Sequence, residues 1–315
     1  MTRMAWTLAA LLGLGGIAAA EEIDSPASSG VETLALDVGS HRGISQDYLV
    51  LPSGGELSGQ MRFVMADAAL GSDPLKFSDL GLLDLAGRWS LLRKLEVSGT
   101  VTLLPKQPSY TSEKPWQSVG VGLRSPIGRT VAVSLTGAGG HLLDHTGMWT
   151  REALMIEWRK PIADVLDFGI TGGIDGISLG DKHQRSALIS ELAIATSALF
   201  REPSGHWGGW VGIAYALPIV ARGTDPTTGL AVDPQARLDL RVGSVLSITK
   251  QWDLYAELAI VDRGDLSNAQ TRLPILDGGF DQQQVILGVT RHLESPRERS
   301  NRDALQLSLA DEGKR

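Results

Sequence analysis

Hydrophobic and polar residues alternate with a period of two along most of the chain between residues 57 and 293. In the clearest segment, 236–248, one parity carries aliphatic side chains such as Leu240, and the other carries charges such as Arg241. Successive side chains of an extended strand point to opposite faces. The alternation therefore predicts strands with one apolar and one polar face, and an all-β fold.

The alternating segments predict about twelve strands, with ten or fourteen as neighbouring options. They cover residues 57–68, 78–90, 95–104, 116–124, 129–138, 150–159, 164–175, 187–199, 207–217, 236–248, 251–262 and 280–293. Short connections (91–94, 125–128, 160–163, 200–206 and 249–251) alternate with long ones (69–77, 105–115, 139–149, 176–186, 218–235 and 263–279). This asymmetry is typical of a transmembrane antiparallel β-barrel with short periplasmic turns and longer outer loops.

Aromatic residues concentrate at the ends of the predicted strands. Those beside short turns are Trp89, Trp158, Phe200, Trp207, Trp210 and Trp252, and those beside long loops are Phe77, Tyr110, Trp116, Trp149 and Phe280. Rings gathered at both strand ends predict girdles at the two membrane–water boundaries. A soluble β-protein would place such rings in its core, so this distribution disfavours that alternative.

The start of the chain has the features of a secretory signal peptide. Arg3 precedes an apolar stretch over 5–17, and three alanines at 18–20 end in a small-residue cleavage site. We therefore predict a signal peptide over 1–20, a leader over 21–56, a barrel over 57–293 and a charged tail over 294–315. The chain contains no Cys, which excludes disulfides and thiolate sites. Its net charge of −7 argues against nucleic acid as a partner.

The signal peptide, the alternation, the turn asymmetry and the aromatic clusters together resemble those of Gram-negative outer-membrane β-barrels, including twelve-stranded channels and pores. The resemblance covers about residues 57–293. It implies export to the outer membrane and contact with membrane lipid and lipopolysaccharide. The chain departs from the class in its low aromatic content of 5%, in Leu293 where an aromatic residue usually closes the last strand, and in the tail.

Charged residues lie in the middle of the polar faces, where a membrane barrel places its lumen. The predicted pore-lining residues are Arg62, Asp84, Arg88, Glu96, Arg151, Glu157, Arg159, Asp167, Asp175, Glu191, Arg237, Asp239, Arg241, Asp253 and Glu257. They predict a pore for passive passage of small polar solutes or ions. Because the two signs are nearly balanced, the alternative is a non-conducting barrel with a structural or surface-interaction role, whose lumen is closed by internal salt bridges or by residues 21–56.

Residues for catalysis or for a cofactor do not form a recognisable motif. Ser134 and Ser186 are available, but no His is convincingly placed beside either, so a lipid hydrolase is a third and weaker hypothesis. We predict no enzyme activity, no metal and no cofactor. The acidic loop sequences at 262–265 and 277–279 are predicted to face outward, where they could bind divalent cations or neighbouring lipopolysaccharide. The sequence does not indicate the oligomeric state.

Overall fold

The computed structural model describes residues 54–293 except for 70–73, 93–94, 104–115, 129, 143–146, 164, 182–184, 203–206, 250, 266–267 and 269. The predicted signal peptide, all but the last three residues of the predicted leader, and the predicted tail lie outside the described residues. No helix with the length and apolar character needed to cross a membrane occurs in the described part of the chain.

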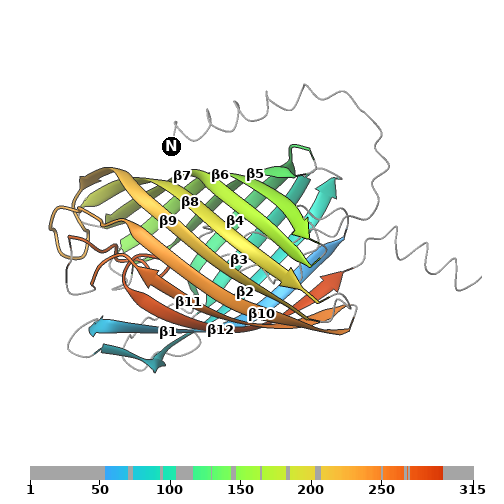
Figure 1. Ribbon diagram of the computed structural model, residues 1–315. Helices are drawn as coiled ribbons and strands as arrows, with labels where there is room; N and C mark the ends of the chain where they lie inside the picture. Colours follow the sequence, from blue (N-terminus) through green and yellow to red (C-terminus); the bar gives the residue numbers. More distant parts are fainter. Residues whose placement is uncertain are drawn as a thin grey trace, which may run out of the picture.

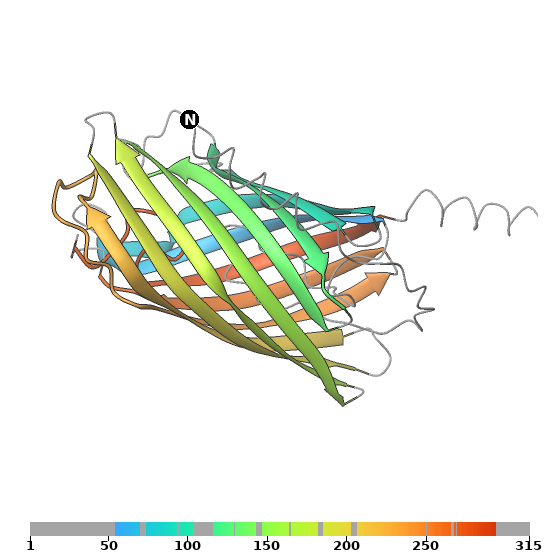
Figure 2. The same ribbon diagram turned by 90° about the horizontal axis from the view of Figure 1, so that it is seen from above.

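Twelve strands form the fold. They are β1 (Gly55–Ala69), β2 (Pro74–Leu92), β3 (Leu95–Leu103), β4 (Trp116–Pro126), β5 (Val131–His141), β6 (Gly147–Ala163), β7 (Leu166–Asp181), β8 (Ser186–Arg201), β9 (Trp207–Gly223), β10 (Arg237–Thr249), β11 (Trp252–Asp262) and β12 (Gln282–Leu293). Each strand pairs antiparallel with its neighbours in sequence, and β1 pairs with β12, so the sheet closes into a barrel (Figures 1 and 2). The prediction of an antiparallel barrel of about twelve strands is confirmed.

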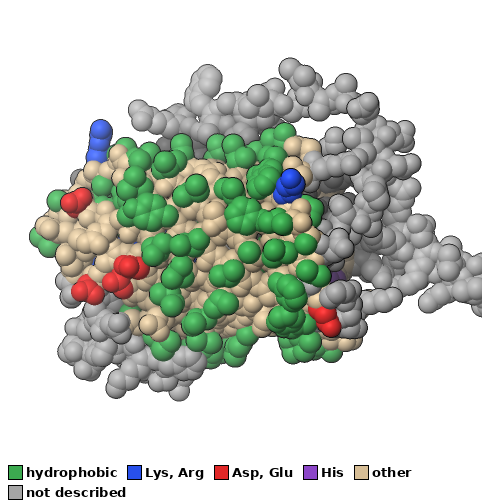
Figure 3. Space-filling model, viewed as in Figure 1, with side chains coloured by type: hydrophobic (Ala, Val, Ile, Leu, Met, Phe, Trp, Pro, Cys, Tyr) green, Lys and Arg blue, Asp and Glu red, His purple; other side chains and the backbone are tan. Residues whose placement is uncertain are grey.

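Residues of alternate parity face the outside and the inside of the barrel, as the alternation predicted. Large aliphatic side chains point outward, for example Val121 with 69% and Ile156 with 57% of its surface exposed. In the face shown in Figure 3, hydrophobic side chains cover the middle of the barrel and charged ones lie toward its two ends. The outer surface therefore matches a hydrocarbon environment, while the inward parity carries the charged residues.

Strands β6 to β8 are longer than predicted, because β6 begins at Gly147 and β7 continues to Asp181. The connections 70–73, 142–146 and 182–185 are correspondingly shorter than expected. In these added ends the inward residues are apolar, including Ile177 and Leu179. The outward side carries Ser178 in the added end of β7 and Met148, which is 51% exposed, in the added end of β6. Polar outward residues, Gly and charges made these segments look like loops in the sequence.

Only one of the two predicted aromatic girdles is present among the described side chains, which do not include those of Phe77 and Tyr110 from the other. Beside the short turns, Trp89, Trp158, Phe200, Trp207 and Trp252 are 37–45% exposed on the outside. Trp210, Trp149 and Phe280 are buried inside instead, with exposed fractions of 4%, 1% and 0%. Trp210 and Trp149 share the parity of inward residues, and Phe280 lies in a connection that folds inward. Position near a strand end was therefore an insufficient criterion without parity.

Two connections meet at the end of the barrel opposite the short turns. Residues 224–236 follow β9. Residues 263–281 follow β11, and we call this second connection the inner loop. Backbone hydrogen bonds join the two, from Asp233 N to Gln270 O (2.8 Å) and from Gln235 N to Thr271 O (3.1 Å). Leu273 and Ile275 of the inner loop are fully buried in a cluster with residues of the barrel wall and Val232. The prediction that these connections face outward is wrong for the inner loop from Arg272 to Phe280.

Candidate functional site

The fifteen residues predicted to line the lumen all lie on the inward face of their strands. Fourteen are buried, and Arg241 is partly buried. The period of two placed them on this face, because each shares the parity of other inward residues on its strand. The structure brings most of them together in ion-paired groups at successive heights along the interior.

The first group lies near the start of β1, at the end of the barrel that carries the short turns. Arg88 donates from Nε to Glu56 (2.7 Å) and lies 3.5 Å from Glu96. His292 stands between two carboxylates, with Nδ1 3.0 Å from Glu56 and Nε2 2.9 Å from Asp253. Because both ring nitrogens face acceptors, both must carry a proton for the two bonds to form, and the imidazole is then a cation.

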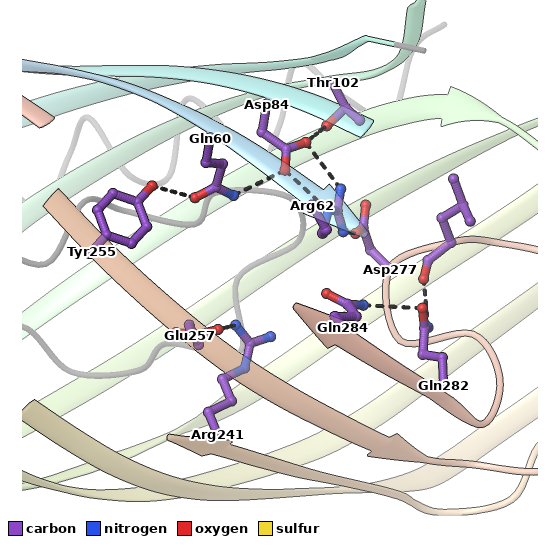
Figure 4. Close-up of polar contacts among 11 residues, drawn as sticks. Gln60, Arg62, Asp84, Thr102, Arg241, Tyr255, Glu257, Asp277, Gln282 and Gln284 are labelled. Atoms are coloured by element: carbon purple, nitrogen blue, oxygen red, sulfur yellow. Dashed lines mark hydrogen bonds and ion pairs between the residues drawn. The ribbon is translucent and has the colours of Figure 1, made fainter. Parts of the chain in front are cut away.

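The second group lies in the middle of the interior (Figure 4). Arg62 donates to Asp84 through Nε and Nη2, each at 3.1 Å, and Thr102 donates to the same carboxylate at 2.7 Å. Arg62 Nη1 bonds to Asp277 of the inner loop. One guanidinium thus joins a wall carboxylate to a loop carboxylate, in the planar fork geometry that makes Arg–carboxylate pairs strong.

On the neighbouring part of the wall, Arg241 and Trp210 both donate to Glu257, at 3.2 and 3.1 Å. Tyr255 bonds to Gln60, which donates in turn to Asp84 (3.0 Å). Gly243 makes room for Trp210, because a Cβ at this position would lie 1.9 Å from the indole Cζ2. Polar contacts therefore link strands that are not neighbours in the sheet.

A third group lies at the level of the inner loop. Arg151 donates to Asp175 at 2.7 and 2.8 Å, and Arg263 of the inner loop bonds to Glu191. Glu191 also lies 3.8 Å from Arg237, which is 3.3 Å from Asp239. Burial, together with the nearby positive charges of Arg237 and Arg151, lowers the pKa of Arg263 to about 10 despite the favourable contact with Glu191.

Strands β6, β8 and β9 contribute a different kind of wall. Their inward residues in the middle of the barrel are Ala153, Met155, Ala193, Ala195, Ala214 and Ala216. Five of these six side chains are single methyl groups, so this wall adds little side-chain volume to the interior. The middle of the interior is therefore uneven, with short apolar side chains on β8 and β9 and long charged ones on β1, β2, β10 and β11, while Arg151 and Glu191 add charges to β6 and β8 nearer the inner loop.

Several residues of the site were missed by sequence reasoning. Gln60 and Tyr255 share the inward parity of Arg62 and Asp253, so parity alone would have included them. Parity would also have predicted that the Trp210 side chain points into the barrel. Asp277 and Arg263 lie outside any alternating segment, and no local pattern indicates that their loop folds inward.

We next asked whether the described residues could hold a metal ion and whether the chain matches known proteins. Among the described residues, no group of three or more His, Cys, Asp or Glu side chains could hold a metal ion. No protein-family model matches the chain, and the comparison with curated proteins gave no match.

Solved structures with a similar fold are outer-membrane β-barrels. The translocator domain of the autotransporter NalP from Neisseria meningitidis is 10% identical with a TM-score of 0.49, over 80% of this chain and 90% of that one. The NanC porin is 10% identical with a TM-score of 0.48, over 75% and 100%. An outer membrane channel from Pseudomonas putida F1 is 12% identical with a TM-score of 0.48, over 78% and 98%. At this distance the likeness describes the barrel architecture alone.

Proposed function

We propose that the protein resides in the outer membrane, where its barrel passes small polar solutes or ions along its interior. The observation that carries the pore is the uneven interior, in which methyl side chains on β8 and β9 lie beside the charged wall of β10 and β11 and apart from the ion pairs of β1 and β2. Small side chains occupy little of the interior themselves, and the charged side chains can replace part of an ion's hydration shell. The inner loop narrows this path at the end opposite the short turns.

The membrane setting is supported by the outer surface. Aliphatic residues cover the middle of the strands, and five aromatic rings stand together beside the short turns. Arg291 points outward there, with its guanidinium 5.3 Å from the centre of the Trp252 ring. A cation stacked on an interfacial ring suits the boundary between lipid and water. Cell fractionation should recover the protein in the outer-membrane fraction.

Single-channel recording in a planar bilayer tests the pore. We expect discrete openings from the refolded protein and a shift in ion preference toward anions for Glu257→Gln, which removes one lumen charge and keeps one of the two acceptor oxygens used by Trp210 and Arg241. A unit charge about 6 Å from a permeating ion in a water-like dielectric changes the energy of each ion by about 0.7 kcal/mol, which is about threefold for a cation and about threefold in the opposite direction for an anion. The cation-to-anion permeability ratio should therefore fall about tenfold. Val242→Thr, on the outward face of β10, is the matched control and should leave the ratio unchanged.

A second candidate, a non-conducting barrel, is favoured by the extent of ion pairing and by the apolar cluster at the inner loop. Buried pairs of this kind hold side chains across the interior. Silence from wild-type protein whose gel mobility is heat-modifiable, as expected of a refolded barrel, would refute the pore and support this candidate.

A further inference from the structure

Asp277 and Gly278 of the inner loop lie among three arginines from three separate strands. Arg62 of β1 bonds to the Asp277 carboxylate, and Arg151 of β6 donates to the Asp277 carbonyl oxygen at 3.4 Å. Arg237 of β10 packs against Gly278, where a Cβ would lie 2.7 Å from Nη1. Gly278 has a φ of +73°, which favours glycine in this tight turn. We call Arg62, Arg151 and Arg237 the arginine site.

The barrel wall holds the arginines of this site independently of the loop. Arg62 uses Nε and Nη2 for Asp84, and Arg151 uses Nε and Nη2 for Asp175. Each guanidinium therefore turns its remaining Nη1 toward Asp277 (Figure 4 shows Arg62). Donors fixed in this way form a preorganised receptor, since little side-chain freedom is lost when an acceptor arrives.

Arg263 supplies a second, independent observation at the same level of the interior. Its side chain is fully buried, and its Nε and Nη1 have no hydrogen-bond partner among the described residues. It shares Glu191 with Arg237, so two guanidinium groups meet one carboxylate. Buried donors without acceptors are costly unless an acceptor occupies the space beside them. Anionic oxygen atoms are the acceptors that suit such donors best.

We propose that the arginine site binds the carboxylate of a small anionic solute, and that Asp277 is its built-in competitor. A solute carboxylate takes the place of the Asp277 side chain on Arg62, with Arg151 and Arg237 of the wall beside it. The inner loop then loses its carboxylate contact with Arg62. This inference deepens the proposed function, because it names small carboxylate-bearing solutes as the class that the interior recognises.

A solute can bind only to molecules in which Asp277 has left the site. The apparent affinity is therefore the intrinsic affinity multiplied by the fraction of such molecules. Removing the Asp277 carboxylate should therefore strengthen solute binding instead of weakening it. A simple solvent-exposed cation would show no such gain. The direction of the effect thus separates a competitor from a residue that merely stabilises the loop.

The test is calorimetric titration of the full mature protein, refolded in detergent, with propionate, whose carboxylate and short alkyl chain copy the Asp277 side chain. Propionamide is the uncharged control ligand. We expect Asp277→Ala to bind propionate about tenfold more tightly than wild type, as for a competitor present about nine-tenths of the time. Asp265→Ala, an exposed carboxylate on the same loop, is the matched control and should behave as wild type. Asp277→Asn, which keeps the shape of the side chain, serves if the alanine variant does not refold.

Equal propionate affinity in Asp277→Ala and wild type, or equal binding of propionamide, would overturn the competitor. Conductance of the same samples separates this result from the proposed function. Discrete openings without tighter propionate binding would leave the pore standing and refute the site. Tighter binding in a barrel that never conducts would keep the arginine site and refute the pore.

Discussion

At the scale of single residues, the interior depends on inward glycines as well as on charges. Gly243 of β10 faces Trp210 of β9 directly across the pair, so the indole lies over the glycine and reaches Glu257. Any larger side chain would displace the ring and break this hydrogen bond. The polar network in the middle of the barrel therefore requires a residue without a side chain at position 243, which could not be inferred from its charged residues alone.

Gly243→Ala should destabilise the barrel by about 1–3 kcal/mol, the usual cost of overpacking a filled interior. The added Cβ would fall 1.9 Å from Trp210 Cζ2, so the indole must move. Gly137→Ala is the control, since a Cβ there meets nothing within 4 Å. Urea unfolding in lipid vesicles, followed by tryptophan fluorescence, measures both. Equal midpoints for the two variants would contradict the packing described here.

At the scale of elements, the outer ends of β6 to β8 change character along their length. In the middle of these strands the outward side chains are aliphatic, as with Ile174, which is 54% exposed. Toward the inner loop, Ile177 and Leu179 turn apolar side chains inward onto Leu273 and Ile275. The interior at this end therefore resembles the core of a soluble β-protein. The charged interior lies nearer the middle of the barrel.

Ile177→Ala should therefore cost about 2–4 kcal/mol, because it leaves a cavity in the apolar cluster. The inner loop should also become accessible to trypsin at Arg263 and Arg272, which are 0% and 7% exposed in the folded protein. Ile174→Ala removes the same atoms from the outward face of the same strand, and its cost should be under about 1 kcal/mol. Equal cleavage and equal unfolding midpoints in the two variants would show that the cluster does not hold the loop.

The same strands show which features of the structure the sequence pattern could predict. Alternation predicted twelve strands and the inward face of every charged residue assigned to it, because parity is a local property. It failed at 176–181, where Gly and polar outward residues hide an inward apolar parity, and at Asp277, whose position depends on Arg62 some two hundred residues away in sequence. Contacts of this kind follow from the closed barrel and the packing of its loops, which the local pattern does not contain.

At the scale of the whole molecule, the barrel exists only if the first strand pairs with the last. Gly55 of β1 pairs with Leu293 of β12, and a chain of polar contacts crosses this closure. Asp253 of β11, His292 of β12, Glu56 of β1 and Arg88 of β2 are joined in that order. The contact therefore spans four successive strands around the point where the sheet closes, and these strands are the most distant in sequence.

His292→Leu should lower the stability of the closed barrel by about 1–3 kcal/mol, because it removes the donor that separates two carboxylates. The cost stays below that of a fully buried pair, since the His292 side chain is 28% exposed. Adding Asp253→Asn should recover part of the loss by removing one of the two charges. Arg291→Gln, at the adjacent outward residue, is the control and should change stability by less than about 1 kcal/mol. The temperature at which the folded band disappears in semi-native gel electrophoresis measures all four proteins. If His292→Leu and Arg291→Gln melt together, backbone pairing alone closes the sheet, and the contacts across the closure add nothing.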